Sequence, residues 1–217
     1  MRSLALILLT SLTGFAFSHP ADVSQLRIGV SREKLDLRFS LNVATIARIV
    51  RIDADGDNQV SYPEIENAVP RVCDFLDRST LISISDEVTN IGEFQRFECL
   101  WPNPQDSQLT PQDAGQRFVD FHFHRAWPSG VVTVRLDFKM FEQLGDLHTI
   151  QGIFQQTGES DTAVEFSLQE PDFLYATGWT APAPRPQAAR QWWSNAMIIG
   201  ALIVLASCFG IVLKNRV

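Results

Sequence analysis

Oxygen-bearing side chains recur at regular spacing between residues 53 and 64. Counted as a loop of twelve positions, this stretch has aspartate at positions 1, 3 and 5, serine at 9 and glutamate at 12. Calcium is a hard cation that takes about six to eight oxygen ligands. The spacing therefore predicts a Ca²⁺ site, with the residue at position 7 contributing its backbone carbonyl. The expected ligands are Asp53, Asp55, Asp57, Gln59, Ser61 and Glu64.

The order of ligands resembles the EF-hand calcium loop. That loop usually carries glycine at position 6, where this chain has Asn58. Asparagine tolerates a left-handed backbone better than most residues, so we expect the sharp turn to form. The alternative is an acidic surface turn followed by a capped helix. A capping box explains Ser61 and Glu64, but it does not explain three alternating aspartates.

A helix on each side of the loop is needed to hold it, and residues 42–78 predict this helix-loop-helix. Asn42 is placed to cap a short helix that leads into the loop. Beyond Glu64, apolar residues recur at helical spacing as far as Leu76. Pro70 interrupts this pattern and predicts a kink or a break. No second acidic loop occurs in the sequence, so we expect this loop to be unpaired.

The rest of the chain favours β-structure, because short apolar stretches alternate with turn residues. Residues 23–31 and 34–41 predict a hairpin. Prolines between residues 102 and 111 predict a long loop. The further candidate strands are 81–85, 94–100, 117–125, 131–138, 147–156 and 162–168. The expected fold is mainly β with α: an antiparallel β-sandwich-like domain that carries one EF-hand.

Both ends of the sequence predict targeting to a membrane. Residues 1–18 are typical of a secretory signal peptide, with an uncleaved anchor as the alternative. Residues 19–180 would form the extracytoplasmic (periplasmic) domain, and residues 181–194 a proline-rich linker. Residues 195–213 predict a transmembrane helix, with a buried core helix as the alternative. Residues 214–217, with Lys214 and Arg216, would be a cytoplasmic tail, which gives a single-pass type I protein of the inner membrane.

Composition and motifs narrow the function classes. The net charge is −7 and no basic stripe is present, which argues against nucleic acid as a partner. No motif of a metalloprotease, a serine hydrolase or a phosphate-binding loop occurs, so we do not expect an enzyme. Cys73 and Cys99 lie in the exported part, where they could form a disulfide or remain two buried thiols.

A second group of possible metal ligands lies on one candidate strand. Asp120, His122 and His124 alternate with apolar residues, so strand geometry places the three on one face. Imidazole and carboxylate groups are ligands for zinc, nickel or copper, and His19 at a processed N-terminus could join them. The alternative is the solvated face of a half-buried strand.

The order of these features resembles the extracytoplasmic N-terminal region of HupE/UreJ-type membrane proteins. The similarity rests on His19-Pro20, the strand from Leu35 to Leu41, the loop from Asp53 to Glu64 and, more loosely, Leu81 to Ser85. It implies an accessory role in nickel or cobalt uptake, with an unidentified membrane-protein partner, and the histidine-bearing strand adds copper as a possible metal. Those proteins continue into several membrane helices, whereas this chain has one apolar span. We therefore expect a tethered calcium-binding module, and keep the metal-uptake accessory as the alternative.

Overall fold

The computed structural model describes residues 22–180. The expected signal peptide, proline-rich linker, transmembrane helix and cytoplasmic tail lie outside these residues. Among the described residues, no helix combines the length and the apolar character that crossing a membrane requires.

The larger sheet has six strands in the order β11-β10-β1-β2-β8-β6. Their bounds are β1 Val23–Ser31, β2 Lys34–Asn42, β6 Glu93–Cys99, β8 Phe118–Ala126, β10 Thr149–Gln156 and β11 Thr162–Phe166. The predicted hairpin is present, with Ser31 opposite Lys34. Neighbouring strands run antiparallel, except that β1 and β10 are parallel. The antiparallel prediction is therefore wrong for this one pair, because β10 follows β9 of the other sheet and no hairpin links it to β1.

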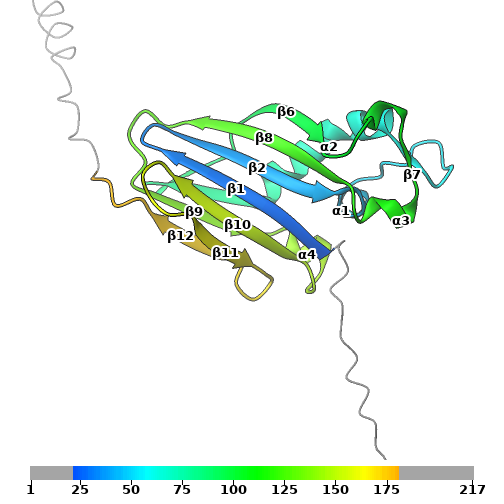
Figure 1. Ribbon diagram of the computed structural model, residues 1–217. Helices are drawn as coiled ribbons and strands as arrows, with labels where there is room; N and C mark the ends of the chain where they lie inside the picture. Colours follow the sequence, from blue (N-terminus) through cyan, green and yellow to red (C-terminus); the bar gives the residue numbers. More distant parts are fainter. Residues whose placement is uncertain (1–21, 181–217) are drawn as a thin grey trace, which may run out of the picture. The chain divides into compact units, whose positions relative to one another are not determined.

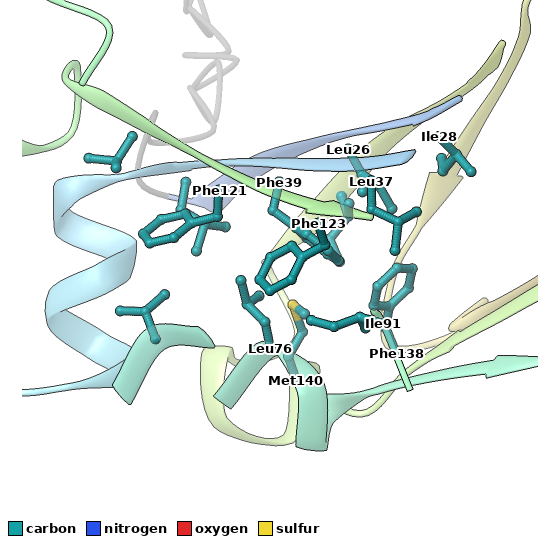
Figure 2. Close-up of a cluster of buried hydrophobic side chains, with 14 of the residues drawn as sticks. Leu26, Ile28, Leu37, Phe39, Leu76, Ile91, Phe121, Phe123, Phe138 and Met140 are labelled. Carbon is teal, nitrogen blue, oxygen red and sulfur yellow. The ribbon is translucent and has the colours of Figure 1, made fainter. Parts of the chain in front are cut away.

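A four-stranded sheet in the order β12-β9-β4-β5 forms part of a second layer (Figure 1). Its strands are β4 Thr80–Ile84, β5 Glu87–Thr89, β9 Thr133–Phe138 and β12 Asp172–Ala176. The sequence prediction missed β5 and β12. The core lies between the layers, where Phe39 meets Phe123 and Phe138 edge to face. Figure 2 shows Leu76 and Met140 facing Phe123 across this core. The mainly β, sandwich-like prediction is confirmed at this level.

Helices cover the end of the sandwich that carries the acidic loop (Figure 1). They are α1 Val43–Ile49, α2 Tyr62–Ser79, α3 Pro111–Ala114, α4 Phe141–Leu144 and the 3-10 helix η2 Pro104–Asp106. The predicted cap of α1 is confirmed, since the Thr45 backbone N–H donates to Asn42 Oδ1 at 2.7 Å. Asn42 is also the last residue of β2, so the strand passes directly into the helix before the loop.

Of the kink or break predicted at Pro70, the break is wrong, because α2 is helical from Tyr62 to Ser79 with Pro70 inside it. A proline within a helix costs about 3 kcal/mol, since it removes one backbone donor and crowds the preceding turn. Pro70 is exposed, while Ile65 and Val69 before it and Val72 and Leu76 after it are buried. Burying one such side chain contributes about 1.5–3 kcal/mol, so packing on both sides outweighs the cost.

Candidate metal centre

The twelve-residue stretch forms the connection between α1 and α2, as predicted. Val60–Ser61 form the short strand β3, and the last three residues of the stretch, from Tyr62 to Glu64, open α2. Val60 is half-buried and packs against the core, which anchors the end of the loop. The loop itself lies at the surface, where Asp55 and Asp57 are exposed and Asp53 is half-buried.

Three carboxylates converge in this loop. Asp53, Asp55 and Asp57 each present an oxygen, and these oxygens all lie within 4.8 Å of one another. Across the part of the chain that the structure describes, they are the one group of three or more carboxylate, imidazole or thiol ligands this close together. Carboxylates at this separation repel one another unless a cation shares their charge. Their chemistry fits calcium, which prefers oxygen ligands.

Backbone N–H groups of the loop hold these carboxylates in place. Asp53 accepts from Gly56 at 2.7 Å and from Asn58 at 3.2 Å. Asp57 accepts from the Gln59 backbone N–H at 2.7 Å. These bonds curl the loop around the carboxylates and orient the acidic side chains.

Asn58 adopts the left-handed conformation expected at position 6, with φ of 61°. Gly56 at position 4 also has positive φ, at 80°. Left-handed backbone is costly for most residues with a Cβ, and asparagine and glycine are the types that tolerate it. The missing glycine at position 6 therefore does not prevent the turn.

Glu64 joins the end of the loop to its beginning. One carboxylate oxygen accepts from the Ala54 backbone N–H at 2.7 Å, and the other accepts from the Ser61 N–H at 2.9 Å and hydroxyl at 2.8 Å. The predicted capping box is therefore present. Desolvation alone would raise the pKa of Glu64, but the hydrogen bonds from Ser61 and Ala54 outweigh it and lower that pKa. Glu64 is thus ionised and placed at the loop, as a ligand at position 12 must be.

The loop pairs with a distant segment that the sequence analysis did not predict, although that segment is not a second acidic loop. Strand β3 pairs antiparallel with β7 (Gln108–Leu109), and Val60 lies opposite Leu109. After β7, Thr110 starts α3 with a capping box to Asp113, as Ser61 starts α2 with one to Glu64. The repeated capping box is visible in the sequence, because Thr-Pro-Gln-Asp at 110–113 is similar to Ser-Tyr-Pro-Glu at 61–64. The segment predicted to be a plain loop therefore supports the acidic loop.

Among the described residues, the histidine-bearing strand does not bring three metal-ligand atoms close together. Asp120, His122 and His124 share the outer face of β8, as predicted, but each side chain has different neighbours. Asp120 is buried, accepts from the Ser40 hydroxyl at 2.5 Å and pairs with Arg38 at 3.5 Å. His124 lies 2.7 Å from Asp36. The three do not bring their ligand atoms together.

Cys73 and Cys99 are free thiols, so the disulfide alternative is not supported. Both are half-buried, one in α2 and one at the end of β6. Desolvation raises the pKa of each thiol to about 11. Neutral, partly buried thiols of this kind are poor nucleophiles and poor metal ligands.

Comparisons with known proteins give no match that would assign a function to this site. No protein-family model matches the chain, and no curated protein matches it. The resemblances to EF-hand loops and to HupE/UreJ-type proteins therefore remain expectations from the sequence.

Proposed function

We propose that this chain is a calcium-binding module that uses a single loop, with Ca²⁺ stabilising the domain or being sensed by it. The observation that carries the proposal is the convergence of Asp53, Asp55 and Asp57 in a loop that Glu64 closes. Asp53, Asp55, Asp57 and Glu64 would hold the ion through carboxylates, with the Gln59 carbonyl and Ser61 completing the oxygen set. A hard dication bound there would neutralise the repulsion between the carboxylates.

Calorimetric titration of the protein with calcium tests this proposal, with Glu64→Gln as the decisive variant. The amide keeps the size of the side chain but loses the charge and one acceptor oxygen. We expect wild type to bind one calcium and the variant to bind at least about tenfold more weakly, since a tenfold change corresponds to about 1.4 kcal/mol. Magnesium should bind more weakly than calcium, because it requires near-ideal octahedral geometry and gives up its water reluctantly.

Glu66→Gln is the matched control, because Glu66 is an exposed residue of the same helix and does not contact the loop carboxylates. It removes the same charge two positions away and should leave calcium affinity unchanged. Equal affinity for wild type and Glu64→Gln, or the absence of calcium binding by wild type, would contradict the proposal.

The membrane topology expected from the sequence is part of the same proposal. The domain would lie outside the inner membrane, anchored by residues 195–213 with Lys214 and Arg216 on the cytoplasmic side. Protease added to the outer side of the inner membrane should then digest the domain and leave a tag placed after Val217 intact. Protection of the domain with digestion of the tag would reverse the orientation.

A further inference from the structure

Basic side chains form a continuous row across the outer face of the six-stranded sheet. The registers place Arg27 of β1 opposite Arg38 of β2, Arg38 opposite His122 of β8, and His122 opposite Arg96 of β6. We call these four residues the basic row. It crosses four neighbouring strands on the side opposite the core, in a chain whose net charge is −7.

The basic row costs stability unless something shares its charge. Neighbouring strands lie about 4.8 Å apart, and like charges directly opposite each other are destabilising. Arg27 and Arg96 are exposed, and within residues 22–180 neither forms an ion pair or a side-chain hydrogen bond. Only Arg38 has an acidic partner, Asp120, at 3.5 Å.

Three acidic side chains lie close to the row. Asp120 accepts from the Ser40 hydroxyl through Oδ1 and faces Arg38 through Oδ2. Asp36 pairs with Lys34 at 2.8 Å and with His124 at 2.7 Å. Glu98 lies opposite Asp120 and acts on His122, but within residues 22–180 it forms no ion pair with Arg27 or Arg96. These two arginines are therefore left without a direct ion-pair partner.

The basic row lines a hollow of about 460 Å³, with Gln95, Gln155 and the ion-paired Asp36 and His124 also in its walls. Gly29 lies in the next row and leaves space there, because it has no side chain opposite Asp36. Among the described residues, His122 Nε2 is a buried polar atom without a hydrogen-bond partner, whereas Arg38 Nε faces Asp120 Oδ2 at 3.5 Å. Buried polar groups of folded proteins are rarely left unpaired, so the unpaired His122 Nε2 calls for a hydrogen-bond partner.

We propose that this hollow binds an oxyanion ligand, specifically one that carries a phosphate group. Arginine is suited to this role because its planar guanidinium donates paired hydrogen bonds to phosphate oxygens. A tetrahedral phosphate dianion presents oxygens in several directions, so donors from β1, β2, β8 and β6 can reach it together. The same charges repel a divalent metal, which explains why the two histidines of this face do not make a metal site.

His122 gives the site a dependence on pH. Desolvation and then Arg96 lower its pKa, with a further lowering from Arg38, while Asp120 and Glu98 act in the opposite direction. These are the charged groups that face the ring from β2, β6 and β8 itself. An anion in the hollow would favour the protonated imidazole, so binding should tighten as the pH falls.

Calorimetric titration of the full-length chain, purified in mild detergent, with inorganic phosphate tests the proposal. We expect saturable binding that the double variant Arg27→Gln/Arg96→Gln weakens at least about tenfold. Arg71→Gln is the control, because Arg71 is an exposed arginine on α2, away from this sheet. Without phosphate, the double variant should melt at the same or a higher temperature than wild type, because like-charge repulsion is relieved.

A second variant keeps every charge and fills the hollow. A Cβ at position 29 would meet Asp36 at an ordinary contact distance of 3.5 Å, so Gly29→Val should fold and still reduce phosphate affinity. Sulfate does not change charge between about pH 8 and about pH 6, so tighter sulfate binding at the lower pH reports on the protein. Glu64→Gln should leave phosphate binding intact, which separates this proposal from the calcium proposal.

The source of the phosphate group is distinguished by two further titrations. Binding of glycerol 3-phosphate alone assigns a soluble ester, whereas variant-sensitive binding to vesicles of phosphatidic acid in phosphatidylcholine assigns a lipid headgroup. Both results support a phosphate site. The proposal would be overturned if neither inorganic phosphate nor glycerol 3-phosphate binds at about 10 mM and the vesicles do not bind either, or if wild type and the double variant bind equally.

Discussion

Glu64 serves both the helix and the loop. Its carboxylate caps α2 through Ser61 and closes the loop through Ala54, so one side chain links the start of the helix to the aspartate cluster. Its folded-state pKa is lowered, so this contribution to stability is present above the unfolded pKa of about 4.5 and is lost as the pH falls through the folded value. Acid should therefore weaken the cap and calcium binding together.

His148 gives the sharpest pH prediction at this scale. The ring is fully buried, with Nε2 at 3.0 Å from the Ser24 hydroxyl and Nδ1 unpaired among the described residues. Desolvation, and then Arg48 nearby, lower its pKa to about 4. An unfolded histidine has a pKa of about 6.5, so between pH 6.5 and pH 4 the unfolded state binds a proton that the folded state does not. The contribution of His148 to the free energy of unfolding is therefore fully present above about pH 6.5 and is lost as the pH falls toward 4.

Because of His148, the free energy of unfolding of wild type should be lower at pH 4.5 than at pH 7 by about 2–3 kcal/mol, at 1.36 kcal/mol per pKa unit. Urea denaturation at the two pH values measures the loss. His148→Gln retains polar atoms that can reach Ser24 but does not titrate, so its loss should be smaller by about that amount. An identical pH dependence in the two proteins would show that His148 is not buried in its neutral form.

At the scale of elements, the sequence predicted what depends on local pattern. The hairpin of β1 and β2, the cap at Asn42 and the acidic loop follow from alternation, capping chemistry and ligand spacing, and all three form as expected. The parallel pairing of β1 with β10 and the short strands β5 and β7 depend on partners far along the chain. The helix through Pro70 depends on packing, which no local rule for proline includes.

The candidate phosphate site was missed for the same reason. Arg27, Arg38 and Arg96 lie on three strands, and no spacing in the sequence indicates that they align. Strand alternation alone placed His122 and His124 on one face, and the metal hypothesis followed from these residues without their cross-strand neighbours. Only the registers show that arginines flank His122 on both sides.

The β3–β7 pairing predicts that a residue outside the loop supports calcium binding. Leu109 is 5% exposed and lies opposite Val60, which ends the loop. Leu109→Ala removes a side chain that packs behind the loop, so the loop should be less ordered without calcium. Ordering the loop then makes calcium binding less favourable. We expect calcium affinity to fall about fivefold, which corresponds to about 1 kcal/mol, by calorimetric titration.

Leu136→Ala controls for general loss of stability. Leu136 is fully buried in β9 of the four-stranded sheet, so both variants lose the same side-chain atoms from the core. The control should be destabilised to a similar extent yet bind calcium with wild-type affinity. An equal loss of calcium affinity in both variants would mean that β7 has no specific role in supporting the loop.

At the scale of the whole domain, the loop is continuous with the sandwich. Asn42 ends β2 and caps α1, Val60 packs against the core, and α2 buries Ile65 and Leu76 on the far side of the loop. An ion that fixes the loop therefore fixes elements that belong to both layers. Calcium should stabilise the domain as one cooperative unit and not as a locally ordered loop.

Thermal unfolding of the chain in calcium and in chelator measures this coupling. A ligand that binds only the folded state adds about 2.7 kcal/mol at a hundredfold excess over its dissociation constant. For a domain of this size, each kcal/mol raises Tm by about 2–4 °C, so calcium should raise Tm by about 5–10 °C. The unfolding transition should remain single, because the ion is tied to both layers, and magnesium should shift it much less.

Glu64→Gln should lose most of the calcium-dependent shift in Tm, whereas Glu66→Gln should keep it. A second, calcium-dependent transition at a lower temperature than the main one would show that the loop orders separately from the sandwich. Identical melting curves in calcium and in chelator would contradict the calcium proposal itself.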